Sequence, residues 1–498
     1  MAVTGQRLSL ATVDRVPAGA RPLVRPGEVS PGIVHLGLGA FHRAHQAVYT
    51  EEAVAAAGGD WGIVAVSPRR RLLVDALAAQ DGLFSVTSLD GAGARTRVVG
   101  AISGVRHAPA DPSAVVALLA DPATRVVTLT VTEKAYLLEP ATGRLRVDPA
   151  LRAELAGQAT PATVPGLLVA ALAARARADA GPVALVSCDN LPANGHRLAG
   201  VVGQALALAG GDAARVRDWV SGNVTFPGTM VDRIVPAPTP ATLVAARAAL
   251  GLADHAAVAA EPFRQWVVED AFPAGRPAWE AAGAVLTRDA GPYERLKLRA
   301  LNGVHSALAY LGVLAGCETI AEALRLPGAR AVVERFVAED VAPSLDPPDG
   351  VSVVAYGRAA LDRFANPVIG HTTRQVAMDG SQKLPQRILH TVADRRAVGG
   401  SPRWAALVVA AWMRFVQGRA DDGRRLPLDD PLAGEIRAAL AGNQRPPAAT
   451  VDALVRLRRV FAPELAEDEV LRKLIAEWLD ALTRHGVAAT LASAGAGR

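Results

Sequence analysis

The pattern of hydrophobic and polar positions divides the chain into two regions. In the first, short apolar runs typical of buried strands alternate with stretches of helical periodicity. The strand-like runs fall at residues 33–36, 61–66, 84–89, 98–105, 125–131 and 182–186. Later residues form mostly Ala-, Leu- and Arg-rich helical patterns with short Pro and Gly turns. We therefore expect an α/β domain over residues 1–287 and an all-helical domain over residues 288–498.

One helical stretch carries a group of candidate catalytic side chains. Residues 291–311 read GPYERLKLRALNGVHSALAYL, with a Gly-Pro start and apolar residues at helical spacing. At about 100° per residue, Lys297 and His305 lie roughly 80° apart around the axis, and Asn302 lies roughly 60° further on. All three face one side of a regular helix, with Lys297 and Asn302 at its edges. A base, an amide donor and an imidazole on one face suit the oxidation of an alcohol.

Lysine is rare in this chain, which draws attention to the few that are present. Of 53 basic Lys and Arg residues only four are lysines, at positions 134, 297, 383 and 473. An Arg side chain does not lose its proton in proteins, whereas a buried Lys can. Lys297 is therefore the candidate proton carrier, while Lys473 is interpreted as an incidental surface residue.

A glycine turn follows the first predicted strand. Residues 32–46 read GIVHLGLGAFHRAHQ, and the layout of strand, glycine turn and helix places a pyrophosphate at a helix N-terminus. We predict cofactor contacts at Gly37, Gly39, Ala40 and Phe41, although the usual third glycine is absent. Two nearby histidines, at positions 42 and 45, have the spacing of a metal pair. Without a nearby carboxylate or Cys we favour a packing or cofactor-proximal role for them.

The end of the second predicted strand selects between cofactors. An acidic residue there binds the ribose hydroxyls of NAD, whereas Arg accommodates the 2′-phosphate of NADP. This chain has Ser67-Pro68 followed by Arg69, Arg70 and Arg71, and no Asp or Glu. The residues favour NADP, unless some of these Arg side chains only begin the next helix.

Four further polar motifs stand out. Thr132-Glu133-Lys134 and the segment SCDNLPANG, residues 187–195, follow predicted strands, and such strand ends face the ligand crevice of an open α/β sheet. The segment FPGTMVDRIVP, residues 226–236, sets the pair Asp232-Arg233 among apolar residues, where a buried ion pair is equally expected. Residues 363–387 supply a dense polar set within the helical region: Asn366, His371, Arg374, Gln375, Lys383 and Arg387.

Composition limits the classes of function. The 498 residues are 50% hydrophobic and 20% charged, as in globular proteins, with a formal charge of +5. The Arg residues are dispersed, so we expect no nucleic-acid partner. Two cysteines leave neither a disulfide framework nor a Cys-rich metal site, and we expect no metal. Without a signal-peptide pattern or an apolar run of 18 residues we expect a cytoplasmic protein that does not bind membranes.

These motifs together resemble the long-chain polyol dehydrogenase family. The matching segments are GLGAFHRAHQ (37–46), TEKAY (132–136), SCDNLPANG (187–195), FPGTMVDRIVP (226–236), VVEDAFPAGRPAWE (267–280), KLRALNGVHSALAYLG (297–312) and RFANP through QKLPQR (363–387). The resemblance implies a Rossmann-type N-terminal domain that binds NAD, an all-helical C-terminal domain, and metal-independent catalysis in the cleft between them. It also implies that Lys297 is the general acid/base, that Asn302 and Asn190 polarise the reacting oxygen, and that His305 orients the substrate.

Within this family the motifs are more similar to fructuronate reductases than to mannitol dehydrogenases. The resemblance implies that Asp232 and Lys383 contact the polyol chain, but Gln375 stands where mannitol dehydrogenases have an Arg. A uronate substrate adds a carboxylate, for which Arg233, Arg374 and Arg387 are the candidate partners. We expect reversible hydride transfer between a nicotinamide cofactor and a sugar acid, in a monomer or homodimer. The alternatives are a reductase of fructose/mannitol, arabinitol or tagaturonate, and a non-catalytic dinucleotide-sensing protein.

Overall fold

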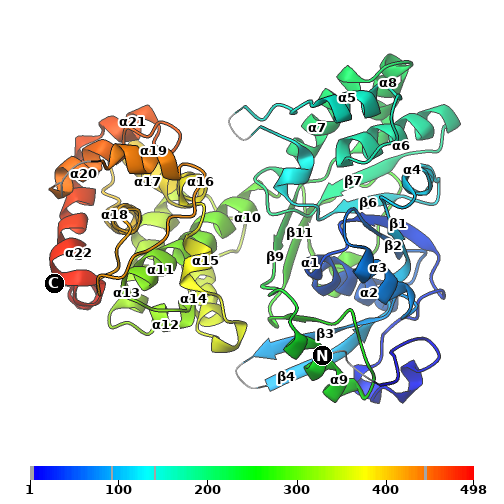
Figure 1. The fold of residues 1–498 in the computed structure, drawn as a ribbon, viewed down its shortest axis with the longest axis horizontal. Coiled ribbons are helices and arrows are strands. Elements are labelled where there is room, and N and C mark those ends of the chain that lie inside the picture. Colours follow the sequence, from blue (N-terminus) through cyan, green and yellow to red (C-terminus); the bar gives the residue numbers. More distant parts are fainter. Residues whose placement is uncertain (1–4, 91–92, 140–141, 442–445, 498) are drawn as a thin grey trace. The chain divides into compact units, whose positions relative to one another are not determined.

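A computed structural model describes residues 5–90, 93–139, 142–441 and 446–497 of the chain. It forms two compact units, Met1–Gly291 and Pro292–Arg498. Figure 1 shows that the first contains the sheets with their surrounding helices, and the second is built from helices.

The main sheet of the first unit has six parallel strands in the order β5-β2-β1-β6-β7-β8. Counted among themselves, these strands have the order 3-2-1-4-5-6 of the doubly wound dinucleotide-binding fold. The topological switch point therefore lies between β1 and β6. The strands span Pro31–Leu36 (β1), Gly62–Ser67 (β2), Ile102–His107 (β5), Val126–Leu129 (β6), Val183–Ser187 (β7) and Val224–Thr225 (β8).

Two hydrophobic cores cover the two faces of this sheet. Successive side chains of a strand point to opposite faces, so Ile33 of β1 enters one core while Val34 and Leu36 enter the other. The helices of the first face are α1 (Ala40–Ala44), α2 (Gln46–Ala57) and α3 (Arg71–Ala78). Those of the second are α4 (Pro112–Ala120), α5 (Pro149–Leu155), α6 (Val164–Ala178), α7 (Asn194–Leu208) and α8 (Ala213–Asn223).

Two small three-stranded sheets complete the first unit. One has the order β10-β3-β4 and lies near α9 (Pro240–Leu250), as Figure 1 shows, and the other has the order β12-β11-β9. Their strands are β3 (Phe84–Asp90), β4 (Gly93–Val99), β9 (Thr229–Asp232), β10 (Val258–Ala260), β11 (Gln265–Glu269) and β12 (Val285–Thr287). Because β9 follows SCDNLPANG and carries the TMVD motif, this second small sheet positions several of the predicted polar residues.

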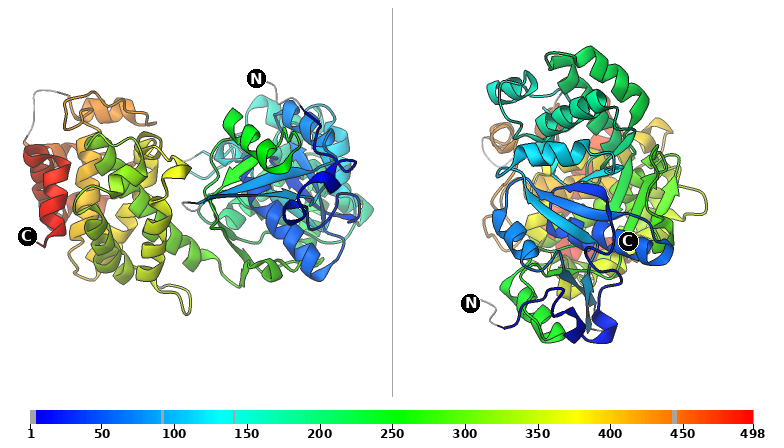
Figure 2. Two further views of the ribbon diagram at one scale, coloured as in Figure 1. Left: turned by 90° about the horizontal axis from the view of Figure 1, so that it is seen from below. Right: turned by 90° about the vertical axis from the view of Figure 1, so that its right-hand side faces the viewer.

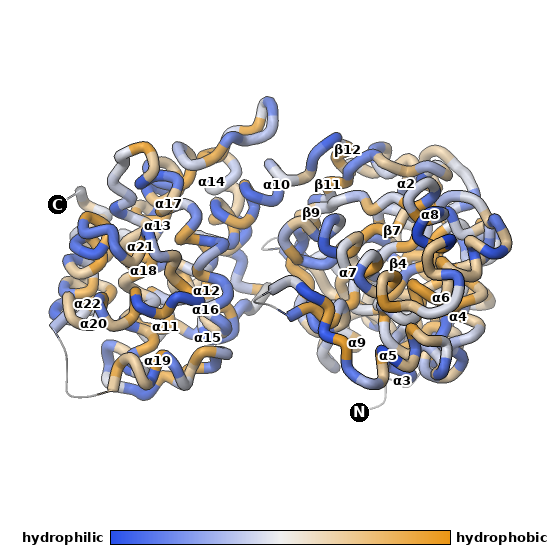
Figure 3. The backbone as a smooth tube through the Cα atoms, turned by 90° about the horizontal axis from the view of Figure 1, so that it is seen from above, coloured by the Kyte–Doolittle hydropathy of each residue, from blue (hydrophilic) through white to orange (hydrophobic). Residues whose placement is uncertain are grey.

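The second unit packs its helices around α18, whose sequence RWAALVVAAWMRF is buried at all but two positions. The views of Figure 2 and the hydropathy colouring of Figure 3 show this helical arrangement. The helices are α10 (Gly291–Leu296), α11 (Gly303–Leu314), α12 (Ile320–Leu324), α13 (Ala329–Arg335), α14 (Val353–Phe364), α15 (Thr373–Ala377), α16 (Gly380–Leu384), α17 (His390–Ala397), α18 (Arg403–Phe415), α19 (Ala433–Ala439), α20 (Pro447–Leu454), α21 (Pro463–Glu467) and α22 (Glu469–Gly495).

Two of the predicted elements are divided in the structure. The run expected as one strand over residues 98–105 is the end of β4 and most of β5, separated at Gly100. A Cβ at Gly100 would collide with the carbonyl oxygen of Val24, and its N–H donates to Glu51 at 2.7 Å, so the chain turns there. The helix expected after Gly39 is also broken, because His45 has non-helical torsion angles between α1 and α2.

Candidate active site

The glycine turn after β1 has the geometry of a phosphate-binding loop. Gly37 has a φ of +108°, and a Cβ there would collide with the carbonyl oxygen of Thr130. Its N–H donates to the carbonyl oxygen of Val66 at 2.9 Å. Gly39 has open space around its Cβ position, and helix α1 begins at Ala40. The turn therefore lies at the switch point of the sheet, with its backbone close to a helix N-terminus.

Two stacked histidines lie beneath this turn. The rings of His35 and His42 are 3.4 Å apart between centroids and both are fully buried. His35 contacts the hydroxyls of Thr128 at 2.8 Å and Thr130 at 2.9 Å, and the carbonyl oxygen of Gly37 at 3.0 Å. Burial lowers the pKa of His35 to about 3 and also depresses the pKa of His42. Burial thus favours the neutral form of both rings, and the contacts of His35 with Gly37 and Thr130 hold the turn.

The end of β2 contains no carboxylate. Ser67 is buried and its hydroxyl contacts the backbone of Arg70, accepting from the N–H at 3.0 Å and donating to the carbonyl at 3.1 Å. Arg69, Arg70 and Arg71 are exposed, and Arg71 begins α3. The first acidic residue is Asp75, one turn into α3, at 3.6 Å from Arg71.

The predicted residues after β6 and β7 divide into exposed and structural ones. Glu133 and Lys134 are exposed on a short 3-10 helix, and Asn190 is exposed after β7. Asp189, which the sequence analysis did not single out, is buried and accepts the backbone N–H groups of Val131 and Thr132. Its carboxylate therefore ties the two strand ends together.

Asn194 has a similar structural role in the same motif. Its side chain donates to the carbonyl oxygen of Asp189 at 3.1 Å and that of Thr229 at 3.0 Å, and accepts from the N–H of Thr229 at 2.9 Å. The polar density of SCDNLPANG thus largely serves to attach β9 to the end of β7. Asp232, at the end of β9, is buried.

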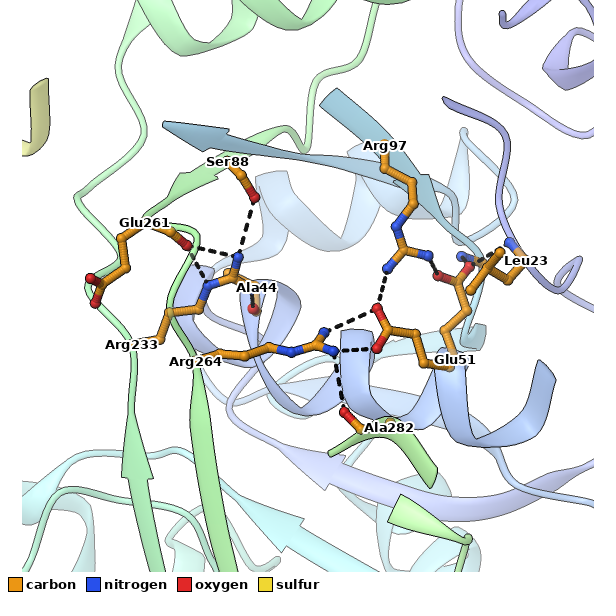
Figure 4. A network of polar contacts seen from close by, with 11 residues as sticks. Leu23, Ala44, Glu51, Ser88, Arg97, Arg233, Glu261, Arg264 and Ala282 are labelled. Carbon is orange, nitrogen blue, oxygen red and sulfur yellow. Dashed lines mark hydrogen bonds and ion pairs between the residues drawn. The ribbon is translucent and has the colours of Figure 1, made fainter. Parts of the chain in front are cut away.

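Arg233 is engaged within the first unit. Figure 4 shows its guanidinium turned toward Glu261, Ala44 and Ser88. It donates twice to the carbonyl oxygen of Glu261, at 2.9 and 3.0 Å, and also to that of Ala44. Burial lowers the pKa of Arg233 to about 10, with the nearby Arg264 adding to the shift. Its N–H groups hold backbone segments together, so the structure disfavours the prediction that it binds a substrate carboxylate.

The predicted catalytic helix contains a π turn. Residues Lys297–Asn302 form this turn between α10 and α11, and both Lys297 and Asn302 are 7% exposed. In a regular α-helix residues five apart differ by roughly 140° around the axis. The i→i+5 hydrogen bonding of a π turn brings them closer together. The expectation of a regular helix is therefore wrong here, and the irregularity draws the two candidate side chains toward one face.

Two other helical segments pack against this π turn. Residues Phe336–Val341 and Pro385–Leu389 are also π turns, and both contact the turn at Lys297–Asn302. Gly303 lies where they meet, since a Cβ there would be 3.0 Å from the carbonyl oxygen of Arg387 and 3.3 Å from the ring of Phe336. The turn is thus held by close packing.

His305 lies in an aromatic stack. Its ring is 4.5 Å from that of Phe364 and 5.3 Å from that of His371. Burial depresses the pKa of His305, with further contributions from His371 and Arg387. The side-chain nitrogen Nδ2 of Asn302 and the Nε2 of His305 are buried without a hydrogen-bond partner among the described residues. Buried polar groups are usually hydrogen-bonded, so these two nitrogens are available to a bound ligand, as are the ring nitrogens of His42 in the first unit.

A cationic cluster adjoins this pair. Arg387 donates to the hydroxyl of Ser306 at 3.1 Å and has no carboxylate partner in the described part of the chain. Lys383 donates to the carbonyl oxygens of Met378 at 2.5 Å and Val376 at 3.2 Å. Burial lowers the pKa of Lys383 to about 8, and Arg387 contributes to the shift. Arg387 and Lys383 repel each other, while the carboxylates of Asp379 and Asp430 attract the ammonium of Lys383.

Arg374 and Gln375 lie elsewhere on the same motif. Both are exposed on the short helix α15, which Thr372 caps by accepting the N–H of Gln375 at 3.2 Å. Sequence spacing therefore grouped residues that the structure separates. The structure instead adds Ser306 and Tyr310, on the same helix as His305, to the cluster around Arg387. Ser306 and Tyr310 lie four and eight residues after Asn302, so helical spacing from Asn302 was the available signal for both.

The described residues contain no group of three or more His, Cys, Asp or Glu side chains placed to hold a metal ion. Within the same residues, no helix is both long and apolar enough to cross a bilayer.

Comparison with known proteins matches both units. The family model described as the mannitol dehydrogenase Rossmann domain matches residues 31–281, and that of the mannitol dehydrogenase C-terminal domain matches residues 289–483. D-mannonate oxidoreductase of Escherichia coli is 40% identical over 90% of this chain and 92% of its own length. Mannitol 2-dehydrogenase of Cereibacter sphaeroides is 38% identical over 95% and 98%. A solved ternary complex of Pseudomonas fluorescens mannitol 2-dehydrogenase with NAD and D-mannitol is 33% identical, with a TM-score of 0.84, and covers 98% of this chain and 99% of its own.

Proposed function

We propose that this chain, which belongs to the mannitol dehydrogenase family of oxidoreductases acting on CH–OH groups, is a fructuronate reductase. The reaction is the reversible reduction of D-fructuronate to D-mannonate with a nicotinamide dinucleotide. In this proposal residues 1–287 bind the cofactor and residues 288–498 bind the sugar acid. The relatives named D-mannonate oxidoreductase and mannitol 2-dehydrogenase are almost equally similar, so overall identity does not choose the substrate.

The observation that carries the choice is the unbalanced charge of Arg387. Its guanidinium has five N–H donors, and Ser306 is its one hydrogen-bond partner among the described residues. A buried cation without a counter-ion is costly, whereas a carboxylate accepts two parallel hydrogen bonds from a guanidinium. The nearby ammonium of Lys383 adds attraction for an anion. A uronate supplies this carboxylate, and a neutral polyol does not.

The two other candidate arginines are poorer partners. Arg374 is exposed, so water competes fully for its hydrogen bonds. Arg233 already donates to the backbone carbonyls of Glu261 and Ala44. Of the three candidate arginines, Arg387 is the one that is partly buried and still has N–H groups without a hydrogen-bond partner among the described residues.

The glycine turn of the first unit fits a dinucleotide. Gly37 adopts a left-handed φ, and the space at Gly39 admits a close approach of phosphate to the backbone. We assign pyrophosphate contacts to Gly37, Gly39, Ala40 and Phe41, and further cofactor contacts to Arg69, Glu133 and Lys134. The solved relative that contains NAD supports a nicotinamide cofactor here. When bound, this cofactor supplies or accepts the hydride at C4 of its nicotinamide ring.

The proposed chemistry assigns a separate task to each polar residue of the π-turn helix. In reduction, the ammonium of Lys297 donates a proton to the carbonyl oxygen as that oxygen becomes a hydroxyl, and in oxidation the neutral amine removes it. The Nδ2 group of Asn302 donates a hydrogen bond to the reacting oxygen and stabilises its developing negative charge. The Nε2 atom of His305 contacts a neighbouring hydroxyl and orients the sugar. Asn190 and Asp232 are assigned as a second amide donor and a hydroxyl contact on the basis of the family resemblance.

The first experiment measures nicotinamide absorbance with purified protein and D-fructuronate, D-tagaturonate or D-fructose. We expect rapid NADH oxidation with D-fructuronate and a kcat/KM for D-fructose lower by about two orders of magnitude or more, because D-fructose leaves Arg387 unpaired. Preference for D-fructose would instead identify a mannitol 2-dehydrogenase, and preference for D-tagaturonate a tagaturonate reductase.

A Lys297→Ala variant tests the catalytic assignment. It should retain cofactor binding, measured by quenching of tryptophan fluorescence, and lose turnover by roughly three orders of magnitude or more. Lys473→Ala, at a distant lysine on α22, is the matched control and should leave turnover unchanged. Cofactor binding without turnover by the unaltered chain on any sugar or sugar acid would instead support a dinucleotide-sensing role.

A further inference from the structure

A cavity of about 580 Å³ lies beside the beginning of α3 in the first unit. The loop between β2 and α3 forms one wall, and the segments around Pro240 and His255 form the others. Three arginines contribute to its lining, Arg43, Arg70 and Arg71, and none of its lining residues is acidic. A cavity of this size with cationic walls can hold a small organic anion.

Few acidic groups compensate the arginines that face this cavity, although Asp254 attracts the guanidinium of Arg43. Arg70 is exposed, and its side chain has no ion-pair partner in the described part of the chain. Arg71 has one acidic neighbour, Asp75, at 3.6 Å, and both side chains are largely exposed, so the pair is weak. Arg43 is buried and donates to the carbonyl oxygens of Gly39 at 3.2 Å and Ala256.

Apart from Thr239 and His255, the rest of the lining is apolar. Leu72, Leu73 and Leu243 contribute to the walls, and Leu72 is 85% exposed. Apolar surface beside unpaired guanidinium groups suits a ligand that joins a flat, weakly polar ring to a phosphate.

The position in the fold identifies such a ligand. In a doubly wound sheet, the residues after the second strand contact the adenosine ribose of a dinucleotide. An acidic side chain there binds the free 2′-hydroxyl, and Arg accommodates a 2′-phosphate. In this chain the Ser67 hydroxyl is hydrogen-bonded to the backbone of Arg70, and no carboxylate lies between Ser67 and Asp75.

We propose that Arg70 and Arg71 form a binding site for the 2′-phosphate of NADP in this cavity. The inference rests on the proposed function, since it concerns the cofactor of the same oxidoreductase. It extends that function by assigning the phosphorylated cofactor in place of NAD as the preferred one. Arg43 stabilises the cavity wall and adds positive potential without contacting the phosphate.

The experiment uses the full-length protein and two cofactor fragments, adenosine 2′,5′-bisphosphate and adenosine 5′-monophosphate. Isothermal titration calorimetry should give a dissociation constant at least tenfold lower for the fragment with the 2′-phosphate, as about two charge-assisted hydrogen bonds predict. Inorganic phosphate should compete weakly. Equal affinity of the two fragments would overturn the proposal, as would affinity for inorganic phosphate as high as for the bisphosphate.

Variants assign the effect to the two arginines. Arg70→Ser and Arg71→Ser should each remove most of the tenfold preference and leave adenosine 5′-monophosphate binding unchanged. Arg217→Ser is the matched control, because Arg217 is an equally exposed arginine on α8 of the same unit. If the preference survived in the Arg70→Ser/Arg71→Ser double variant, the assignment to these residues would be wrong.

Kinetics separates this inference from the proposed function. With D-fructuronate, we expect a kcat/KM for NADPH at least tenfold above that for NADH, and the double variant should reverse this order. Activity with D-fructuronate and NADH but without a 2′-phosphate preference would reject the phosphate site and leave the reductase intact. Conversely, a clear preference for the bisphosphate without D-fructuronate activity would retain the phosphate site and reject the proposed substrate.

Discussion

Arg233 in the first unit and Arg387 in the second are both arginines in poorly hydrated surroundings, and they differ in how their donors are used. Arg233 donates through all three nitrogens of its guanidinium, chiefly to the backbone carbonyls of Glu261 and Ala44. Among the described residues, Arg387 makes one hydrogen bond, to Ser306. Burial lowers the pKa of both groups. Burial and a shifted pKa therefore do not distinguish a ligand-binding arginine from a structural one. The number of guanidinium N–H groups that already have an acceptor does.

A third arginine shows a similar structural use of this side chain, although its Nε has no partner among the described residues. Arg175 on α6 is 1% exposed, and its two terminal nitrogens donate to six backbone carbonyl oxygens at 2.9 to 3.3 Å. These carbonyls belong to the loops at residues 119–124 and 180–182. Like Arg233, it holds irregular backbone that would otherwise carry unsatisfied acceptors.

Among the variants that test the contrast between Arg233 and Arg387, Arg387→Ala should have the largest effect. Loss of the carboxylate partner should lower kcat/KM for D-fructuronate by roughly two to three orders of magnitude, because a charged pair is broken. Thermal stability should stay unchanged or rise, since an unpaired buried charge is removed. Steady-state kinetics and a melting curve measure both. Equal losses with D-fructuronate and D-fructose would contradict the assignment, since D-fructose has no carboxylate.

Arg233→Met should show the opposite pattern. The carbonyl oxygens of Glu261 and Ala44 lose their donors, so the free energy of unfolding should fall by about 2–3 kcal/mol. Denaturant titration of the folded variant checks this value. The folded fraction should keep a KM for D-fructuronate within about threefold of the original. A large rise in KM without loss of stability would make Arg233 a substrate residue and abolish the contrast.

The pH dependence of kcat/KM tests the role of Lys383 beside Arg387. Its folded pKa is lowered to about 8, below the ordinary value of 10.5, so the cationic form that attracts a carboxylate is present below pH 8 and disappears above it. We expect kcat/KM for D-fructuronate to fall about tenfold from pH 8 to pH 9.5. In Lys383→Arg this decline should vanish, because Arg stays charged. A decline that persists in the variant belongs to another group, such as Lys297.

The smallest effect is expected from Ser306→Ala. This change removes the one hydrogen bond that orients the guanidinium of Arg387. The KM for D-fructuronate should rise by roughly three- to tenfold, with kcat nearly unchanged, because a single neutral acceptor is lost. Ser306→Thr keeps the hydroxyl and should restore most of the affinity. An unchanged KM in Ser306→Ala would show that packing alone positions Arg387.

The sequence predicted the regular elements well, for reasons that are local. Helix α6 spans Val164–Ala178, because Thr163 caps its N-terminus by accepting the N–H of Gly166 at 3.0 Å and a proline follows at the second helical position. The apolar runs of β1 and β7 are buried on both faces, as strands of a parallel sheet must be. The family was also recognisable from motifs, and the comparisons confirm it.

The misplaced expectations have a common physical origin in long-range contacts. The segment SCDNLPANG drew attention as a polar strand end, yet its Asp189 and Asn194 satisfy backbone groups of segments up to 58 residues away. The break between β4 and β5 depends on Val24 and Glu51, which no local pattern at Gly100 reveals. A period of 3.6 residues likewise cannot anticipate the π turn at Lys297–Asn302, which packs against two other turns.

The sequence by itself determined the two-part architecture, the glycine turn and the identity of the candidate proton carrier, because periodicity, a left-handed glycine and a rare lysine are properties of short segments. Only the tertiary structure decided which arginine has donors to spare. That depends on which carbonyl oxygens other segments bring within about 3 Å of each guanidinium. Arg233 finds them in the first unit, and Arg387 in the second is left with Ser306.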